Sequence, residues 1–575
     1  MKTYKWIIQE TDADLKLMAK VLKISETTAN VMANRGLRSK NAALSFLSPS
    51  LHTLHDTLRM KDAEAALIRI SAAINSKEKI VVYGDYDADG IMSVAIMQKV
   101  LTRLGADISH YIPHRQDEGY GMNICAVQKL AADGTRLIIA VDNGIVAVEE
   151  IALAAELGID TVIIDHHEPG DVLPNAVAIV DPKQHDCDYP FKEMCAAGLT
   201  YKIAAALCDF LGVSFDERDE MLVFASVATI CDIVPLVGEN RVIVNCGLAV
   251  LSANKLINPG LGSLITVRGY LGKPVDAFTV GYVVGPCLNA TGRLESAELS
   301  IELLMAHDFA RRMTLAHKLS DLNEQRKSLT SDCVHRVLEE LDMDNLDKVL
   351  VIVDTEAHES VAGIVAGRVR EITNRPTVLL THGDGEMKGS GRSVPAFNLY
   401  EALSAHRELF TRFGGHAMAA GLTMPAENIP ILREALNRDC RMTEEDFHSV
   451  MMIDRELGMA EVTLELSDEL TRLAPFGKDN SEPLFITRGL LAENVRVLDE
   501  KHTLIFTFYS PYGGRVKGIA YGLNKVYAEH LAANGMTEQK RGGFSMDVVY
   551  NIEANVYNGV TSVQMRVRDF LILAE

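Results

Sequence analysis

Short apolar runs alternate with longer helical patterns in the first third of the chain. The apolar runs have strand length, and the segments between them, such as 93–104 and 146–157, have helical periodicity. Strands spaced by helices in this way indicate βαβ units and a parallel, doubly wound sheet of the α/β class. Helical patterns then dominate residues 195–251. We expect one catalytic domain over 76–305, with strands at 80–83, 108–112, 137–141, 161–164 and 176–180.

The rest of the chain divides by pattern into further parts. Residues 306–341 are polar, have apolar positions at spacings of three and four, and lack Gly and Pro, which predicts a long connecting helix over 306–345. A second α/β domain is expected over 346–450, with strands at 349–353 and 377–380. Residues 1–75 show helical and irregular patterns without candidate chemistry, so we interpret them as an N-terminal helical extension.

Beyond residue 450 the pattern is typical of antiparallel strands. Segments 503–509 and 547–557 alternate, and Asn558-Gly559 then turns the chain into 562–567, which is a hairpin signal. Residues 501–575 hold eight Lys or Arg against six acids. This balance favours an OB-fold β-barrel over 451–575 that binds nucleic acid. The interleaved aromatic residues that could stack on bases are Phe506, Tyr509, Tyr512 and Tyr557.

Composition limits the class of protein. The 575 residues carry a net charge of −21, which excludes coating of nucleic acid by bulk electrostatics but allows a local basic groove. The chain has no run of 18 apolar residues, and its start becomes acidic too soon for a signal peptide. Nine Cys without a C-x-x-C pair predict reduced thiols rather than a disulfide framework or zinc ribbon. We therefore expect a cytoplasmic protein that does not enter membranes.

Acidic and imidazole groups follow three of the expected strands. The first strand leads into GDYDADG (84–90), the third into VDNG and the fourth into IDHH, while Asp232 follows a helical run in CDIVPL. Because ligands bind beyond the carboxyl ends of parallel strands, these groups should converge. Asp and His together are ligands for hard or borderline divalent metals. The predicted metal ligands are Asp85, Asp87, Asp89, Asp142, His166 and Asp232.

Two alternative functions of the loop 84–90, an EF-hand and a dinucleotide site, do not fit the sequence. An EF-hand needs a Glu at its twelfth position, where this chain has Ile96, and a helix where a strand precedes the loop. A dinucleotide site needs G-x-G-x-x-G, whereas three carboxylates here would repel a pyrophosphate. Two dications about 4 Å apart repel by roughly 17 kcal/mol at an effective dielectric constant near 20, which five carboxylates can offset. The pattern therefore predicts two ions, Mn²⁺ or Mg²⁺, and the nitrogen of His166 favours Mn²⁺.

These residues carry a resemblance to a known family. YGDYDADG, VDNG, DHH and CDIVPL, in this order, resemble motifs I to IV of the DHH phosphoesterase superfamily. His358-Glu359-Ser360, KGSGRSVPAFNLYEAL and Gly414-Gly415-His416 resemble its DHHA1 partner domain. YIPHRQDEGYG, GPCLNATGRL and LAPFGKDNSEPLF are similar to segments of the RecJ family of bacterial single-stranded-DNA-specific exonucleases. Over residues 45–575, the chain thus resembles that family.

The resemblance implies roles for individual residues. Asp142, His166 and His167 would be catalytic, with His167 in or beside the metal site. Apart from the resemblance, residues 389–393 (GSGRS) can bind an anion through backbone N–H groups, a hydroxyl and a guanidinium. Residues 414–416 could likewise present N–H groups at a helix start. Cys287 stands where the family would have a basic residue, which puts one phosphate contact in doubt. The residues implied to bind substrate are Arg115, Asn289, Arg293, His358, Ser390, Arg392 and His416.

The expected function is a two-metal exonuclease that degrades single-stranded DNA. The resemblance implies the 5′→3′ direction, a role in DNA repair and recombination, a monomer, and partners such as single-strand-binding protein and a RecQ-type helicase. The two catalytic domains and connecting helix should form a ring around one strand. One alternative is a DHH phosphodiesterase of nanoRNA or cyclic dinucleotides, which would not need the last 125 residues. Another is a non-catalytic replication scaffold, against which the intact Asp and His set argues.

Overall fold

The computed structural model describes residues 4–573 except 116, 384, 510–513 and 537–542. Its first domain contains a parallel sheet with strand order β3-β2-β4-β5-β6. Alternate residues of β2 enter two cores, Ile80 and Val82 under α4, α5 and α8, and Val81 and Tyr83 under α6 and α7. The doubly wound parallel sheet is therefore confirmed. Its elements are α4 (Ala63–Asn75), β2 (Lys79–Tyr83), α5 (Ala88–Arg103), β3 (Asp107–Tyr111), α6 (Ile124–Ala132), β4 (Leu137–Val141), α7 (Val148–Glu156), β5 (Asp160–Ile164) and β6 (Ala178–Val180).

Helices complete the first domain and lead to the second. A π-helical turn, η3 (Val280–Val284), lies between α12 (Ala277–Thr279) and α13 (Gly285–Leu294). The expected long helix is present as α15 (Phe309–Glu340). The remaining helices of this region are α8 (Ala196–Phe210), α9 (Arg218–Cys231), α10 (Gly238–Ala253), α11 (Pro259–Val267) and α14 (Glu298–Met305).

The second α/β domain contains a five-stranded sheet with order β10-β11-β9-β8-β7. Residues 414–416, expected at a helix start, instead lie in the edge strand β10, so that part of the prediction was wrong. In this strand Gly414 pairs with Gly421 and Gly415 with Ala420, so residues 414–416 hydrogen-bond within a sheet. The elements are β7 (Leu350–Val353), α16 (Glu359–Thr373), β8 (Thr377–His382), β9 (Met387–Arg392), α17 (Leu399–Ser404), β10 (Arg412–His416), β11 (Ala419–Met424) and α18 (Ile429–Asp439).

The C-terminal domain is a closed barrel. Its strands follow the order β14-β15-β16-β18-β17, and pairing of β14 with β17 closes it, with β16 parallel to β18. This confirms the OB-type barrel. Phe506 lies in its core, stacked on Phe508, so it cannot contact bases, and Tyr512 lies outside the described residues. The elements are β13 (Arg455–Glu456), α19 (Leu464–Thr471), β14 (Phe485–Leu498), β15 (Thr503–Tyr509), β16 (Arg515–Tyr521), α20 (Asn524–Ala533), β17 (Phe544–Tyr557) and β18 (Val560–Ile572).

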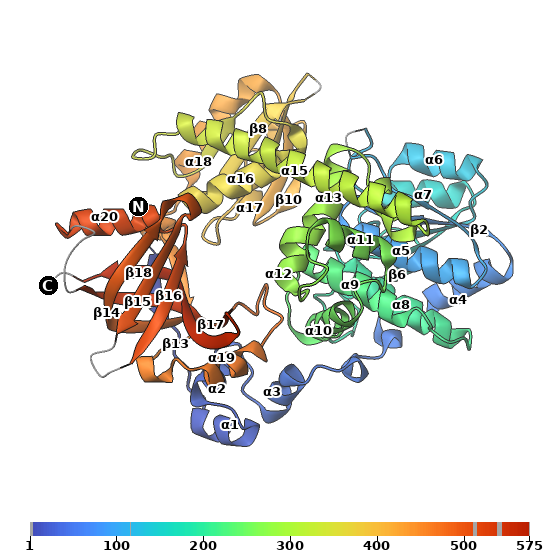
Figure 1. Ribbon diagram of the computed structural model, residues 1–575. Helices are drawn as coiled ribbons and strands as arrows, with labels where there is room; N and C mark the ends of the chain where they lie inside the picture. The colour runs from blue at the N-terminus through green and yellow to red at the C-terminus, as the bar shows by residue number, and fades with distance from the viewer. Residues whose placement is uncertain (1–3, 116, 384, 510–513, 537–542, 574–575) are drawn as a thin grey trace.

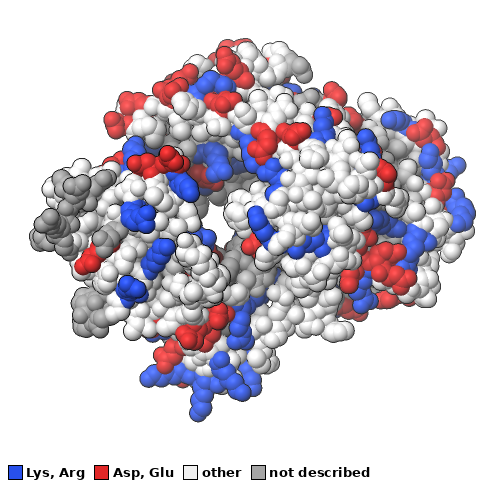
Figure 2. Space-filling view, in the orientation of Figure 1, with Lys and Arg blue, Asp and Glu red and all other residues white. Residues whose placement is uncertain are grey.

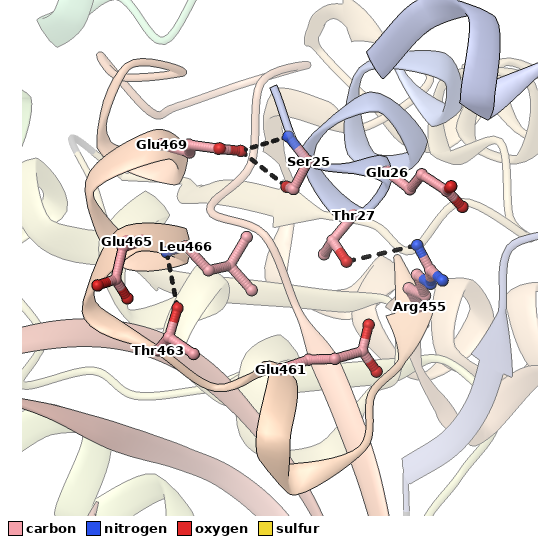
Figure 3. Close-up of a pocket in the computed structure, with 9 residues that line it drawn as sticks. All are labelled: Ser25, Glu26, Thr27, Arg455, Glu461, Thr463, Glu465, Leu466 and Glu469. Atoms are coloured by element: carbon pink, nitrogen blue, oxygen red, sulfur yellow. Dashed lines mark hydrogen bonds between the residues drawn. The ribbon is translucent and has the colours of Figure 1, made fainter. Parts of the chain in front are cut away.

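The N-terminal segment differs from the helical extension that was expected. It opens with a strand, β1 (Tyr4–Ile8), which pairs in parallel with β12 (Ser449–Ile453). Helices α1 (Leu15–Leu22), α2 (Glu26–Asn34) and α3 (Lys40–Leu47) then share one apolar core with the barrel. Figure 3 shows one contact of this junction, in which Glu469 accepts hydrogen bonds from N and Oγ of Ser25 at 2.8 and 2.7 Å. Residues 4–47 thus pack on the C-terminal domain.

A single buried arginine joins three parts of the chain. Arg241 of α10 is 2% exposed, and its guanidinium lies 3.7 Å from the centre of the Phe46 ring. It donates hydrogen bonds to the carbonyl oxygens of Phe46, Leu473 and Arg472 at 3.0, 2.8 and 3.3 Å. Burial lowers the pKa of Arg241 to about 10. Arg241 therefore ties the first domain to both α3 and the end of α19.

The domains surround an opening. In Figure 1, α15 crosses the top of the molecule between the two α/β domains, and the barrel faces α12 from the opposite side of the opening. Figure 2 shows that the opening persists when all atoms are drawn, and that Lys and Arg atoms lie at its edge. Within the described ranges, no helix is both long and apolar enough to cross a bilayer.

Candidate active site

The carboxyl ends of β2, β4 and β5 bring the predicted acids together. β2 ends at Tyr83, and Asp87 caps α5 by accepting hydrogen bonds from the N–H groups of Asp89 and Gly90 at 2.9 and 3.2 Å. A Cβ at residue 90 would lie 2.4 Å from the carbonyl oxygen of Asp85, so only glycine fits there. Asp142 follows β4 with φ of +62°, a strained conformation for a residue other than glycine that turns the backbone directly after the strand.

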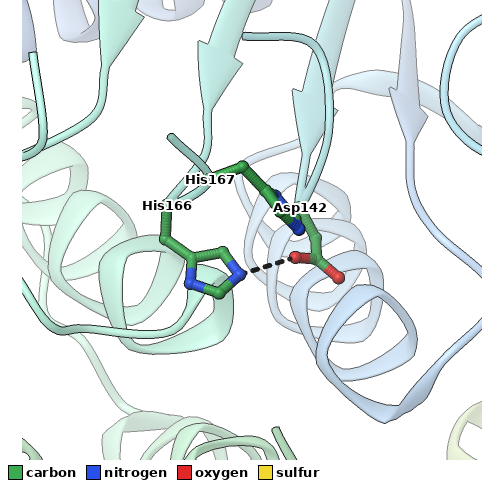
Figure 4. Close-up of side chains that lie close together, drawn as sticks. All are labelled: Asp142, His166 and His167. Carbon is green, nitrogen blue, oxygen red and sulfur yellow. Dashed lines mark ion pairs between the residues drawn. The ribbon is translucent and has the colours of Figure 1, made fainter. Parts of the chain in front are cut away.

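His166 lies at the centre of the acidic cluster. Its Nε2 is 3.3 Å from Asp142, 3.7 Å from Asp89 and 3.8 Å from Asp232. Figure 4 shows His166 and His167 beside Asp142 beyond the ends of the strands. Among the residues that the structure describes, three groups of side chains have ligand atoms close enough to hold an ion, namely Asp142, His166 and His167; Asp89, His166 and Asp232; and Asp85, Asp87 and Asp142. The geometry therefore brings all six predicted metal ligands together.

The protonation of the cluster fits divalent cations. Burial, reinforced by neighbouring carboxylates, raises the pKa of Asp89 to about 7 and that of Asp232 to about 8. The same causes raise the pKa of Asp85 and Asp142 well above the usual range. Asp85 Oδ1 is buried without a hydrogen-bond partner. Buried carboxylates that lack a counter-charge are satisfied by cations, and these oxygen donors suit Mn²⁺ and Mg²⁺.

The two histidines have opposite electrostatic environments. Burial and the neighbouring His167 lower the pKa of His166 to about 3, which keeps its imidazole neutral and able to bind a metal. Burial alone would lower the pKa of His167, but its hydrogen bond from Nδ1 to Asp165, 2.7 Å long, raises that pKa to about 9. The hydrogen bond to Asp165 therefore favours the protonated form of His167.

Residues predicted to bind phosphate lie across the site. Ser390 and Arg392 extend from β9 toward α16, where a Cβ at Gly363 would lie 2.9 Å from the Ser390 hydroxyl and 2.8 Å from an Arg392 nitrogen. Burial, with the nearby Arg115 and Arg370, lowers the pKa of Arg392. Arg115 lies over the ring of Tyr86 at 5.2 Å. Because the described ion pairs include neither Arg115 nor Arg392, both can take an anion.

Three other predicted positions have structural contacts. Arg293 donates a hydrogen bond to the carbonyl oxygen of Ser360 at 3.1 Å, and His358 caps α16 through Ser360. The side-chain oxygen of Asn289 accepts the N–H of Ala88 at 2.7 Å, so it supports the metal-binding loop. These contacts leave other polar atoms of the three side chains for a substrate.

His416 and Cys287 lie at opposite extremes of exposure. His416 is exposed on β10 at the edge of an interdomain cavity of about 1150 Å³ that also includes His166 and His167. Cys287 is fully buried and donates a hydrogen bond from Sγ to the Val283 carbonyl oxygen at 3.2 Å. The side chain of Cys287 therefore faces the core. It does not supply the phosphate contact that a basic residue at this position would supply in the family.

Two residues near the site were not singled out from the sequence. The Tyr120 hydroxyl is 3.0 Å from Nε2 of His167 and donates a longer hydrogen bond to the Asp142 carbonyl oxygen at 3.4 Å. Lys478 belongs to a loop of the C-terminal domain. Its carbonyl oxygen accepts a hydrogen bond from the N–H group of Leu236 at 2.8 Å. Both lie in segments that carried the family resemblance, but neither segment says which of its residues faces the metals.

A parallel sheet whose strand ends hold this Asp and His cluster, linked by a long helix to a second α/β domain, defines a phosphoesterase of the DHH class. Family models match residues 79–230 (DHH family, N-terminal domain), 346–442 (DHHA1 domain) and 453–569 (RecJ OB domain). Together they cover more than half of the chain. The order and character of the three matched segments agree with the domains seen in the fold.

Named relatives support the same assignment. RecJ of Salmonella typhimurium is 31% identical, with 93% of this chain and 94% of that protein covered. RecJ of Bacillus subtilis is 39% identical over 505 residues, which are 87% of this chain but 63% of that protein's length. The chain belongs to the RecJ family, whose curated members are named single-stranded-DNA-specific exonucleases.

Solved structures of RecJ share this fold and were determined with divalent metals. RecJ from Thermus thermophilus in complex with Mn²⁺ has a TM-score of 0.83 and 28% identity, covering 99% of this chain and 79% of the solved one. The same protein has also been solved with Mg²⁺, with a TM-score of 0.78 and 27% identity over 99% and 78% of the two chains. The choice of Mn²⁺ or Mg²⁺ as cofactor is thus confirmed at the level of the family.

Proposed function

We propose that this protein is a metal-dependent exonuclease that hydrolyses single-stranded DNA from the 5′ end. The observation that carries the proposal is the cluster of carboxylates around His166, which lies in a cavity that His416 also lines. Arg392, beside Ser390, is close enough to His416 and Arg115 to change or share their electrostatic environment. Two ions held there supply Lewis acidity and an activated water for attack on a phosphodiester. Asp85, Asp87, Asp89, Asp142, His166 and Asp232 would hold them.

The chain's own residues then bind the strand and move a proton. Arg392, Ser390 and Arg115 bind a terminal phosphate, with Arg293, Asn289, His358 and His416 around the adjoining nucleotide. The Nδ1–H group of His167 donates a hydrogen bond to Asp165, and Nε2 points toward the Tyr120 hydroxyl. Its raised pKa allows Nε2 to donate a proton to the leaving 3′ oxygen. Asp142 both holds metal and fixes the turn that positions this pair.

The cellular role follows from the family. Degradation from the 5′ end would serve DNA repair and recombination in the cytoplasm, in a monomer that acts with single-strand-binding protein and a RecQ-type helicase. Action on a single strand is supported by the opening in Figure 2, which has Lys and Arg atoms at parts of its edge. An opening of this kind favours one strand over a duplex.

The test uses strands labelled at either end, as single strands and duplexes, with Mn²⁺ or EDTA. We expect loss of the 5′ label as mononucleotides from single strands, dependence on metal, and complete loss of cleavage in Asp142→Ala. Retention of more than a few per cent of turnover by that variant in Mn²⁺ contradicts the two-metal assignment. Cleavage limited to di- and trinucleotides would instead indicate a small-substrate phosphodiesterase.

A further inference from the structure

Arginine side chains gather where α13, α15, α16 and β9 pack against one another (Figure 1). Arg293 belongs to α13, Arg326 to α15, Arg370 to α16 and Arg392 to β9. Arg115, in the loop between β3 and α6, completes the group. We call these five side chains the arginine cluster. Two of its members, Arg326 and Arg370, have no part in the terminal-phosphate site described above.

The members of the arginine cluster act on one another. Burial, Arg115 and Arg326 lower the pKa of Arg293 to about 10. Burial, Arg115 and Arg370 lower the pKa of Arg392. Because like charges lower each other's pKa in this way only when they are close, the cluster is continuous, and Arg115 connects its two branches.

The cluster runs outward from the metal site. Burial raises the pKa of Asp85, and the charge of Arg115 opposes that increase, so Arg115 is the member beside the metals. Among the described residues, no predicted metal ligand acts on Arg326 or Arg392. Arg326 and Arg370 are each reached through another arginine and therefore form the outer ends of the cluster.

The Arg370 end lies along one face of α16. A Cβ at Gly363 would lie 2.8 Å from a terminal nitrogen of Arg392, and a Cβ at Gly367 would lie 3.9 Å from Arg392 Cγ. Residues three or four apart share one side of a helix, so Arg370 follows Gly363 and Gly367 on the same face. The two glycines let Arg392 lie against α16, with Arg370 beyond it.

The cluster lacks counter-charges. Arg370 comes no closer than 4.0 Å to Glu371, which lies nearer to Arg368, at 3.0 Å, and the Nε of Arg370 is buried without a hydrogen-bond partner. Glu324 acts on Arg326 but pairs with another arginine and a lysine at 2.8 and 3.0 Å. The other members form no ion pair with a described carboxylate. Since buried charges in proteins are normally paired, the cluster is suited to an anionic ligand.

A terminal monophosphate does not match the whole cluster. It carries a charge of about −1.5 to −2 at neutral pH, which is less than the guanidinium groups carry. The strand extends from its terminal phosphate toward the metals, so a monophosphate end places nothing beside Arg326 and Arg370. Further phosphates joined to the 5′ phosphate would lie there.

We propose that the site also accepts 5′ ends that carry a diphosphate or triphosphate, with Arg326 and Arg370 binding the outer phosphates. This inference rests on the proposed function and adds a class of substrate to it. Water bonds to the first internucleotide phosphorus, the bond from phosphorus to the 3′ oxygen breaks, and that oxygen takes a proton. The first product is a nucleoside 5′-triphosphate, and the remaining strand has an ordinary 5′ monophosphate.

The first experiment measures binding of 3′-labelled ten-nucleotide oligothymidylates with a 5′ monophosphate or a 5′ triphosphate, in EDTA so that neither is cleaved. We expect wild type to bind the triphosphate end about tenfold more tightly or better, as charged hydrogen bonds to phosphate would give. In Arg326→Gln/Arg370→Gln the two affinities should agree within about twofold. Arg438→Gln, at an exposed arginine of α18 paired with Asp439, is the control and should keep the wild-type preference.

The second experiment needs no variant. Wild type in Mn²⁺ is given the triphosphate strand, and the first product is separated by ion-exchange chromatography. Release of thymidine 5′-triphosphate supports the proposal. Equal binding of both ends by wild type, or an unchanged preference in the double variant, overturns it even where the monophosphate strand is degraded normally. If wild type cleaves no monophosphate strand, the proposed function itself fails, which is a separate result.

Discussion

Asp165 accepts a hydrogen bond from Nδ1 of His167 at 2.7 Å and, through the same carboxylate, from the backbone N–H groups of His166 at 2.7 Å and Ile145 at 3.1 Å. It is fully buried. Burial alone would raise its pKa, but the hydrogen bond and charge of His167 lower the pKa of Asp165 to about 2. One carboxylate therefore holds the backbone after β5 and favours the protonated form of His167.

Asp165→Asn should lower kcat about 100-fold or more with little change in KM, because the amide cannot hold His167 in its protonated form. The measurement is steady-state turnover of a 5′-phosphorylated strand in Mn²⁺. Asp160→Asn, at the exposed start of the same strand β5, is the control and should leave kcat unchanged. A normal kcat in Asp165→Asn would show that the charge of His167 plays no part in turnover.

Much of the fold and of the metal site could be predicted because both follow from local patterns. The segment 503–509, predicted as a strand, is β15. The acids after residues 83, 141 and 164 meet because parallel strands place their carboxyl ends on one edge. The Asp and His types then suffice to indicate divalent metals.

What could not be predicted depends on contacts between distant segments. The strand β1 is only five residues long and its partner β12 lies beyond residue 448, so nothing local distinguishes it from an irregular start. Phe506 and Tyr557 alternate along similar strands, yet one is in the barrel core and the other is 72% exposed. Which loop residue lies near the acidic cluster, as Lys478 lies near Asp232, depends on how the domains pack.

Without metal, stability should fall as pH rises. The pKa values of Asp89 and Asp232, about 7 and about 8 in the folded protein, lie above the ordinary value of 3.8. These groups favour folding fully below pH about 4 and lose that contribution as pH rises through 7 to 8. In EDTA, we expect a lower Tm at pH 8 than at pH 6, measured by differential scanning calorimetry.

Added Mg²⁺ or Mn²⁺ should reverse this trend, because metals and protons compete for the same carboxylates. The increase in Tm on adding metal should be larger at pH 8 than at pH 6. In Asp142→Ala the Tm without metal should equal or exceed that of wild type, since one repelling charge is gone. An increase in Tm that is the same at both pH values would indicate that metal binds elsewhere.

Arg392→Ala should reduce kcat/KM on a 5′-phosphorylated strand far more than Lys525→Ala does. The Arg392 guanidinium is partly buried and held toward Ser390 and Gly363, so losing its contact with a phosphate costs about 1.5–3 kcal/mol, or about 10- to 150-fold. Lys525 is 90% exposed on α20. Initial rates on matched strands with and without the 5′ phosphate provide the check, and equal losses in both variants would contradict a phosphate site at Ser390 and Arg392.

Arg241→Met should destabilise the whole protein by about 2–4 kcal/mol, because it leaves the carbonyl oxygens of Phe46, Leu473 and Arg472 buried without donors. Urea denaturation measures the change. Arg311→Met, which removes an exposed pairing with Glu302, is the control and should leave the transition midpoint unchanged. A wild-type midpoint in Arg241→Met would mean that the three segments are held together by their apolar contacts alone.

The pairing of β1 with β12 also has a consequence during protein synthesis. Tyr4 is translated 445 positions before its partner Ser449. At bacterial elongation rates of about 5–20 residues per second, this delay is roughly 20–90 s. Both α/β domains have been translated by then, while the N-terminal strand and the helices behind it still lack their partners. The nascent chain can thus complete its metal-binding half before β1 pairs with β12.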